Sequence, residues 1–155
     1  MTRALMTFVA LVACKPAGMA PAPVLVQPAD TLRGTLIVEG SAPFPIYALR
    51  SAGGRVVIDS AGASLLKVDH LDVWLRGTRT SADRFRVSDY RVRSANGAVA
   101  WDGILRGDSD NLRLDLDDGS SHAIRSAPAG LERLVGSRIW FTENPDGSLR
   151  EYGVL

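Results

Sequence analysis

The sequence predicts an all-β protein, and two observations support this prediction: an internal repeat, and short strand-like segments separated by turn residues. The chain has 155 residues, the length of one ordinary domain or two very small ones. Hydrophobic residues make up 46% and charged residues 23%, a composition typical of folded proteins. The net charge is only +1, so no bulk polyanion or polycation is expected as a partner.

The repeat emerges when residues 53–77 are aligned with residues 119–143. The identities are Gly53 with Gly119, Ser60 with Ser126, Ala61 with Ala127, Ala63 with Ala129, Leu65 with Leu131 and Trp74 with Trp140. Apolar positions coincide as well, and the match extends outward with small gaps, pairing Gly34 with Gly103 and Tyr90 with Tyr152. A unit of about 55 to 60 residues is marginally stable alone, so the two units are expected to pack together.

Each unit is expected to contain three strands, a short helical turn and two further strands. The first unit has its strands at 31–39, 46–50, 55–59, 72–76 and 84–93, with the turn at 62–68. The second has them at 103–106, 112–116, 122–125, 137–142 and 148–154, with the turn marked by Leu131 and Leu134. Asn96 and Gly97 are expected to form the turn between the units.

The strand at 84–93 contains a change of parity. Phe85 and Val87 alternate on one side, whereas Tyr90 and Val92 have the opposite parity. A β-bulge near Ser88 and Asp89 would return all four to the same face, because a bulge inserts one extra residue into a strand.

This order of elements resembles the OB fold, a five-stranded Greek-key barrel. The resemblance implies two tandem OB-like modules, one at 31–95 and one at 96–155. It depends on element order and on no family-specific motif. A single antiparallel barrel or sandwich shared by both halves is the alternative.

The first residues have the pattern of an export signal: Arg3, an uncharged apolar run at 4–13, and then Cys14. The run is about half of the roughly 20 apolar residues needed to span a bilayer. Its end, Leu11, Val12, Ala13 and Cys14, resembles the lipobox of bacterial lipoproteins. The resemblance implies that residues 1–13 are a removed signal peptide and that Cys14 is acylated. The alternative is an ordinary signal peptide that is cleaved elsewhere.

Residues 14–30 are expected to form the lipidated cysteine and a Pro/Ala-rich tether. The 16 residues from Lys15 to Asp30 include four prolines and could reach roughly 50 Å when extended. The segment from Val24 to Val26 could instead dock on the domain or pair with a sheet edge. Because Lys15 rather than aspartate follows the cysteine, the lipoprotein resemblance implies the periplasmic side of the outer membrane more than the inner membrane.

Arginine supplies the first group of candidate site residues. The chain has 16 arginines and two lysines, and Arg84, Arg86, Arg91 and Arg93 are predicted to face away from the core. Guanidinium groups bind phosphate and carboxylate bidentately, so these four are possible anion-binding residues for an anionic envelope ligand, such as lipid headgroups or cell-wall carboxylates. A solvated sheet face is the simpler interpretation. Nucleic acid is an unlikely partner because the domain is neutral and the chain is expected to be exported.

Tryptophan supplies the second group. Trp74 and Trp140 occupy equivalent repeat positions and should point away from their apolar neighbours, while Trp101 lies at the junction of the units. The three are expected at a module interface or, less favoured, in a ligand groove.

No catalytic, metal-binding or cofactor-binding residues are predicted. The single cysteine and two histidines give no metal spacing, and the acidic run at 115–118 before Gly119 has the wrong spacing for an EF-hand and fits a hairpin turn. The expected function is therefore non-enzymatic binding or scaffolding of another envelope component. The alternatives are binding of a small anionic ligand or ion, and, less favoured, a hydrolase using His70 or His122.

Overall fold

The computed structural model describes residues 29–40, 43–59 and 63–155. The predicted signal peptide, Cys14 and nearly all of the tether lie outside these residues. Within the described ranges, no helix is both long enough and apolar enough to span a membrane.

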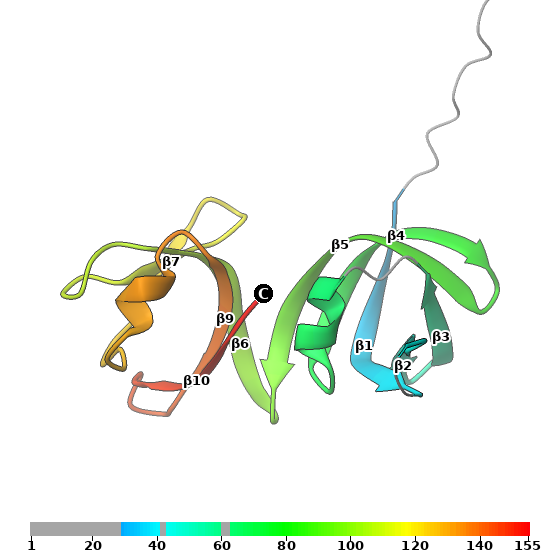
Figure 1. Ribbon diagram of the computed structural model, residues 1–155, viewed down its shortest axis with the longest axis horizontal. Coiled ribbons are helices and arrows are strands. Elements are labelled where there is room, and N and C mark those ends of the chain that lie inside the picture. Colours follow the sequence, from blue (N-terminus) through cyan, green and yellow to red (C-terminus); the bar gives the residue numbers. More distant parts are fainter. Residues whose placement is uncertain (1–28, 41–42, 60–62) are drawn as a thin grey trace, which may run out of the picture.

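The structure is all-β, as predicted (Figure 1). The strands are β1 (Asp30–Glu39), β2 (Ile46–Ser51), β3 (Gly54–Asp59), β4 (Asp72–Ser81), β5 (Arg84–Ala95), β6 (Ala98–Arg106), β7 (Arg113–Asp115), β8 (Ser121–Ala123), β9 (Arg138–Glu143) and β10 (Leu149–Val154). Two short 3₁₀ helices, η1 (Ala63–Val68) and η2 (Leu131–Leu134), lie where the sequence predicted helical turns.

In the first half, the strand pairs form a closed cycle that begins and ends at β1. Antiparallel pairs join β1 to β2 and β2 to β3, and a parallel pair joins β3 to β5. Further antiparallel pairs join β5 to β4 and β4 to β1. The short element η1 connects β3 to β4.

The second half pairs its strands in a similar order. The central strand β6 pairs with both β7 and β9, while β8 pairs with β7 and β10 pairs with β9. A single parallel bridge between Arg125 and Ser148 links the chain after β8 to the chain before β10. The halves are joined through the β5–β6 hairpin, so the ten strands form one connected sheet.

Residues aligned in the sequence repeat have equivalent strand partners. Gly34 lies opposite Val73, as Gly103 lies opposite Ile139. In the same way, Leu75 lies opposite Tyr90. Its counterpart Phe141 lies opposite Tyr152.

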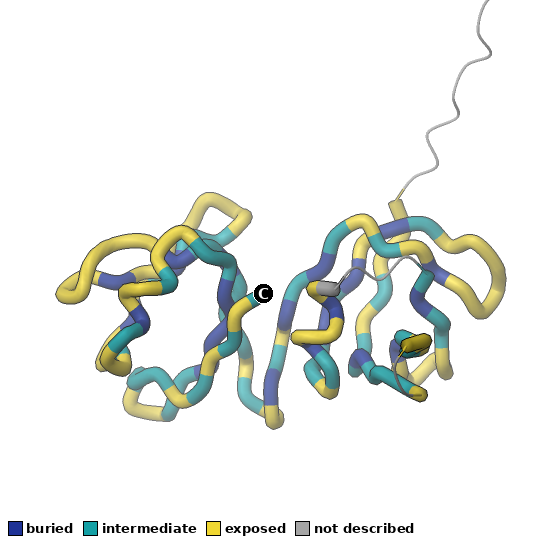
Figure 2. Tube along the Cα trace, viewed as in Figure 1, coloured by how far each residue is buried: buried dark blue, intermediate teal, exposed yellow. Residues whose placement is uncertain are grey.

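Each half has its own hydrophobic cluster. Leu36, Leu75 and Phe85 are buried in the first, and Leu105 and Phe141 are buried in the second. Figure 2 shows buried residues along the strands of both halves and exposed residues mainly in the connecting turns. The alternation of apolar residues therefore places one core in each half.

The predicted bulge in β5 is confirmed. Asp89 lies opposite Arg76, but Val87 lies opposite Gly77, so Ser88 is the extra residue. Phe85 and Tyr90 are both buried as a result.

The predicted strand boundaries differ from the structure at several places. Strand β6 begins at Ala98 rather than at residue 103, because the two-residue turn at Asn96 and Gly97, both with positive φ, pairs β6 with β5 immediately. Strand β4 continues to Ser81 and β5 to Ala95. By contrast, β7 and β8 have only three residues each.

Candidate functional site: a groove between the two halves

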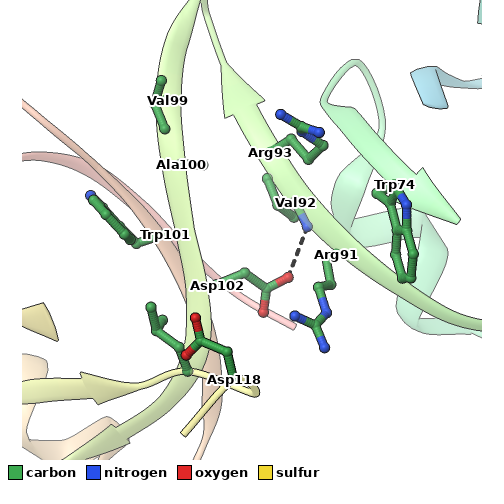
Figure 3. A pocket seen from close by; sticks show the side chains of 10 residues that line it. Trp74, Arg91, Val92, Arg93, Val99, Ala100, Trp101, Asp102 and Asp118 are labelled. Atoms are coloured by element: carbon green, nitrogen blue, oxygen red, sulfur yellow. Dashed lines mark hydrogen bonds between the residues drawn. The ribbon is translucent and has the colours of Figure 1, made fainter. Parts of the chain in front are cut away.

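Strands β5 and β6 diverge from their shared turn (Figure 1). A groove of about 460 Å³ lies there between the two halves (Figure 3). It is lined by Trp74, Arg91, Val92, Arg93, Val99, Ala100, Trp101, Asp102, Leu116 and Asp118. Its walls come from β4, β5 and β6 and from the chain between β7 and β8.

The groove opens because the ladder between β5 and β6 is short. Only Ser94 with Val99 and Ala95 with Ala98 are paired. Val92 lies opposite Val73 and Ser94 lies opposite Asp72, so Arg93 is an extra residue in β5 at the point where the ladder ends.

Beyond that point, the side chain of Asp102 replaces the backbone ladder. Its Oδ2 accepts a hydrogen bond from the backbone N–H of Val92 at 2.8 Å (Figure 3). The guanidinium group of Arg138 donates to the same carboxylate, with Nε 2.9 Å from Oδ1 and Nη2 3.1 Å from Oδ2. Arg138 also donates to the carbonyl oxygen of Tyr90 and lies over the Tyr90 ring at 5.0 Å. Side chains from β6 and β9 thus bind the edge of β5 at Tyr90 and Val92, where β5 has no backbone ladder with β6.

The Asp102 carboxylate is only 4% exposed. Burial raises its pKa above the ordinary value, although hydrogen bonds from Arg138 and Val92 oppose the rise. Arg138 also loses solvent, which lowers its pKa, but hydrogen bonding and the charge of Asp102 leave its pKa raised overall. The ion pair therefore joins β6 and β9 within the second half, and both of its members also bind the backbone of β5 in the first half. Removing one member would leave the other without its partner.

Trp74 and Trp101 contribute to opposite sides of the groove (Figure 3). The Trp101 ring stacks on His122 with centroids 4.0 Å apart, and its indole N–H donates to Oε2 of Glu143 at 3.3 Å. The other carboxylate oxygen of Glu143 lies 2.9 Å from Nε2 of His122. This cluster fixes the Trp101 ring.

Trp140 does not line the groove. It is 7% exposed and belongs to the hydrophobic cluster of the first half, although it is on β9 of the second half. A Cβ on Gly153 would lie 2.6 Å from its Nε1, so glycine is required there for the indole to fit. Trp140 therefore packs between the halves.

The four arginines predicted as an anion-binding group are divided between two regions. Arg91 and Arg93 line the groove, whereas Arg84 lines a second hollow on the first half. Arg86 is exposed and lies next to Asp59 in the β3–β5 pairing.

Within the groove, Arg91 and Arg93 have different surroundings. Nη2 of Arg91 pairs with Oδ2 of Asp117 at 2.6 Å, and its guanidinium lies 5.9 Å from the Trp74 ring. Its Nε is buried and has no hydrogen-bond partner among the described residues. Arg93 is exposed and makes no ion pair with any of the residues that the structure describes.

The acidic run forms a turn, as the sequence predicted. Oδ1 of Asp118 accepts hydrogen bonds from the backbone N–H and the hydroxyl of Ser120, and Gly119 between them has a φ of 84°. Among the described residues, no group of three His, Cys, Asp or Glu side chains is placed to hold a metal ion.

The two histidines lie apart from each other. His70 is exposed and its Nε2 lies 3.5 Å from Oδ2 of Asp69, whereas His122 pairs with Glu143. In the described chain, neither histidine is hydrogen-bonded to a Ser, Thr or Cys side chain. Among the described residues, the arrangement thus offers a histidine–carboxylate contact beside the groove and no serine, threonine or cysteine bound to a histidine.

Sequence reasoning did not identify Asp102, Arg138 or the support of Trp101 by His122 and Glu143. Asp102 and Arg138 are separated by 36 positions and have no charged motif around them. The available signal was weak: Arg138 lies inside the predicted strand at 137–142, Asp102 lies just before the predicted strand at 103–106, and both side chains could equally have been solvated.

Comparison with protein-family models, curated proteins and solved structures finds no match. The lining combines two indoles, several aliphatic side chains, the exposed guanidinium of Arg93 and the exposed carboxylate of Asp118, so it offers an apolar surface with charged groups of both signs.

Proposed function

We propose that this chain is a non-enzymatic, lipid-anchored protein of the bacterial cell envelope that binds another envelope component in the groove between its halves. The observation that carries the binding proposal is the groove itself, with Trp74 and Trp101 on its sides and Arg93 exposed within it. Clefts with a mainly apolar lining and a few polar groups are the usual form of binding sites.

The fold part of the proposal is two OB-like modules in tandem. It is supported by the closed order of pairing in the first half and by the parallel β3–β5 pair. It is also supported by the position of a short helix between the third and fourth strands of each half. The matching partners of Gly34 and Gly103 favour the same architecture in both modules.

The anchor part of the proposal depends on the lipobox-like residues that end at Cys14. Acylation of this cysteine would hold the protein at the membrane, since each buried acyl CH₂ group contributes about 0.8 kcal/mol. The tether would then let the groove meet its partner at a distance from the bilayer.

The groove proposal is tested by photocrosslinking in cells. A photoreactive amino acid replaces Val99, which is 71% exposed and lines the groove. The same substitution at Val135, which is exposed and outside the groove lining, is the matched control. We expect an adduct from position 99 only, and its loss when Trp74→Ala is added. Identical adducts from both positions, or an adduct that Trp74→Ala leaves unchanged, would contradict the proposal.

A small anionic ligand is the second candidate occupant, favoured by Arg93 and by the unpartnered Nε of Arg91. It predicts that citrate or inorganic phosphate raises the Tm of the protein, because a ligand that binds only the folded state stabilises it. The shift should vanish in Arg93→Gln and persist in Arg133→Gln, an exposed arginine on η2. Equal shifts in the two variants would argue against this candidate.

A further inference from the structure

A second hollow, of about 570 Å³, lies on the outer surface of the first half, over β2, β3 and the start of β5. Ile46, Val57, Arg55 and Arg84 are among its lining residues. It shares no lining residue with the groove between the halves. Nothing in the proposed function uses this surface.

Two large apolar side chains stand open to solvent here. Phe44 is 83% exposed and Ile46 is 48% exposed, and they lie two positions apart where the chain enters β2. Single exposed apolar residues are ordinary on protein surfaces. An exposed aromatic and an exposed aliphatic residue beside a hollow lined by arginines form a more specific arrangement.

Arg55 and Arg84 line the same hollow as Ile46. Glu39 pairs with both Arg55 at 2.7 Å and Arg50 at 3.4 Å. Arg84 pairs with Asp59 at 2.9 Å.

Arg86 lies next to Asp59 in the β3–β5 pairing and makes no ion pair among the described residues. Asp83 adds a third carboxylate, whose charge acts on Arg55 and Arg84. The four arginines therefore outnumber the three carboxylates by one, and the surface keeps a small excess of positive charge. We call Phe44 and Ile46, together with Arg50, Arg55, Arg84 and Arg86, the β2–β3 patch.

We propose that the β2–β3 patch rests on an anionic lipid surface, with Phe44 and Ile46 entering the headgroup layer and the arginines facing lipid phosphates. This combination of exposed apolar side chains and basic residues is what interfacial binding requires. Arginine also suits it because its stem packs on apolar groups while its guanidinium remains polar.

A single-stranded nucleic acid fits the patch less well. Such ligands are bound by several aromatic platforms along a strongly basic track. The β2–β3 patch offers one strongly exposed ring, Phe44, and beside it an aliphatic side chain that suits an acyl boundary.

The lengths of the elements are compatible with this orientation. Phe44 follows the end of β1, whose ten residues span about 33 Å, whereas the tether enters at the start of β1. The 16 residues from Lys15 to Asp30 could reach roughly 50 Å, so an anchored chain is long enough for the patch to return to the membrane. This step alone relies on the proposed anchor.

The proposal is tested with a site-specific probe on the full chain. Cys14 is the only cysteine, so Cys14→Ser provides a background in which Phe44→Cys or Val99→Cys can be labelled with an environment-sensitive fluorophore. Val99 is the matched control because it is also strongly exposed and lies outside the patch. The leading apolar run is the same in both proteins, and the label reports only its own surroundings.

Vesicles of phosphatidylcholine with phosphatidylglycerol should abolish iodide quenching of the label at position 44 and leave quenching at position 99 unchanged. Vesicles of phosphatidylcholine alone should protect position 44 less. Adding Arg84→Gln and Arg86→Gln should reduce the protection seen with anionic vesicles. Equal quenching at both positions with anionic vesicles would overturn the proposal.

Protection of position 44 by a single-stranded oligonucleotide, with no effect of vesicles, would likewise overturn it. The result is separable from the proposed function: Phe44→Ser should leave crosslinking from Val99 intact, because the β2–β3 patch and the groove share no residue.

Discussion

At the scale of single residues, Asp102 has the largest structural consequence in the groove. Its buried carboxylate accepts hydrogen bonds from the backbone of β5 and from Arg138 of β9. It therefore compensates for the backbone ladder that β5 and β6 lack beyond Ser94 and Val99.

Asp102→Ala is expected to reduce the free energy of unfolding by about 3–5 kcal/mol, because it leaves the guanidinium of Arg138 and the N–H of Val92 without their acceptor. Urea unfolding measures this loss. Asp110→Ala, at an exposed turn residue, should change stability by less than about 0.5 kcal/mol.

Arg138→Met in the Asp102→Ala background supplies the double-mutant cycle. The double variant should be less destabilised than the sum of the two single variants, because no unpaired buried charge remains. Additive losses would mean that the two side chains act independently, contrary to the geometry.

At the scale of elements, two glycines allow the backbones of neighbouring strands to approach each other closely. A Cβ on Gly34 would lie 2.2 Å from the carbonyl oxygen of Arg50, and one on Gly103 would lie 2.2 Å from that of Asp115. The same close approach thus occurs at equivalent positions of β1 and β6.

Gly34→Ala and Gly103→Ala should each lower the free energy of unfolding by about 1–3 kcal/mol or more, since backbone must move to admit the methyl group. Thermal or urea unfolding checks this. Gly53→Ala is the control, because its Cβ would meet nothing closer than 3.7 Å. If Gly53→Ala lowered the free energy of unfolding as much as Gly103→Ala, the close approach of β6 and β7 at Gly103 would be contradicted.

Much of the element order could be predicted from sequence. Turn residues such as Asn96 and Gly97 act locally, and the parity change between Phe85 and Tyr90 requires an extra residue whatever surrounds it. The local sequence is therefore enough to predict both the turn and the bulge.

The groove could be predicted only in part. Trp74 and Trp101 are recognisable from their positions, but the partnership of Asp102 and Arg138 depends on how β5, β6 and β9 meet in space. The early start of β6 was missed because residues 98–102 lie before the aligned repeat position Gly103.

At the scale of the whole molecule, stability should depend on pH through carboxylates in turns. Hydrogen bonds from Ser120 lower the pKa of Asp118, and hydrogen bonds from Ser148 lower the pKa of Asp146. A lowered carboxyl pKa stabilises the folded state above the ordinary value of 3.8, and this contribution is lost as the pH falls through the lowered pKa. The pKa of Asp102 is raised, so its contribution to the free energy of unfolding changes with pH in the opposite direction and increases as the pH falls.

The Tm should therefore fall on acidification below about pH 4, and the fall should be smaller in the Asp118→Asn, Asp146→Asn double variant. Asp30→Asn, at an exposed carboxylate that starts β1, should retain the full dependence. Calorimetry across this pH range measures both. A double variant as acid-sensitive as the unaltered protein would show that these turns do not determine the dependence.

The proposed function requires that this two-part β structure is attached to the membrane through a lipid on Cys14. The most direct measurement is incorporation of radiolabelled palmitate, with detergent-phase partitioning, in cells making the unaltered protein or Cys14→Ser. We predict label, cleavage before residue 14 and detergent partitioning for the unaltered protein only. Identical processing of both proteins, with no label in either, would contradict the claim.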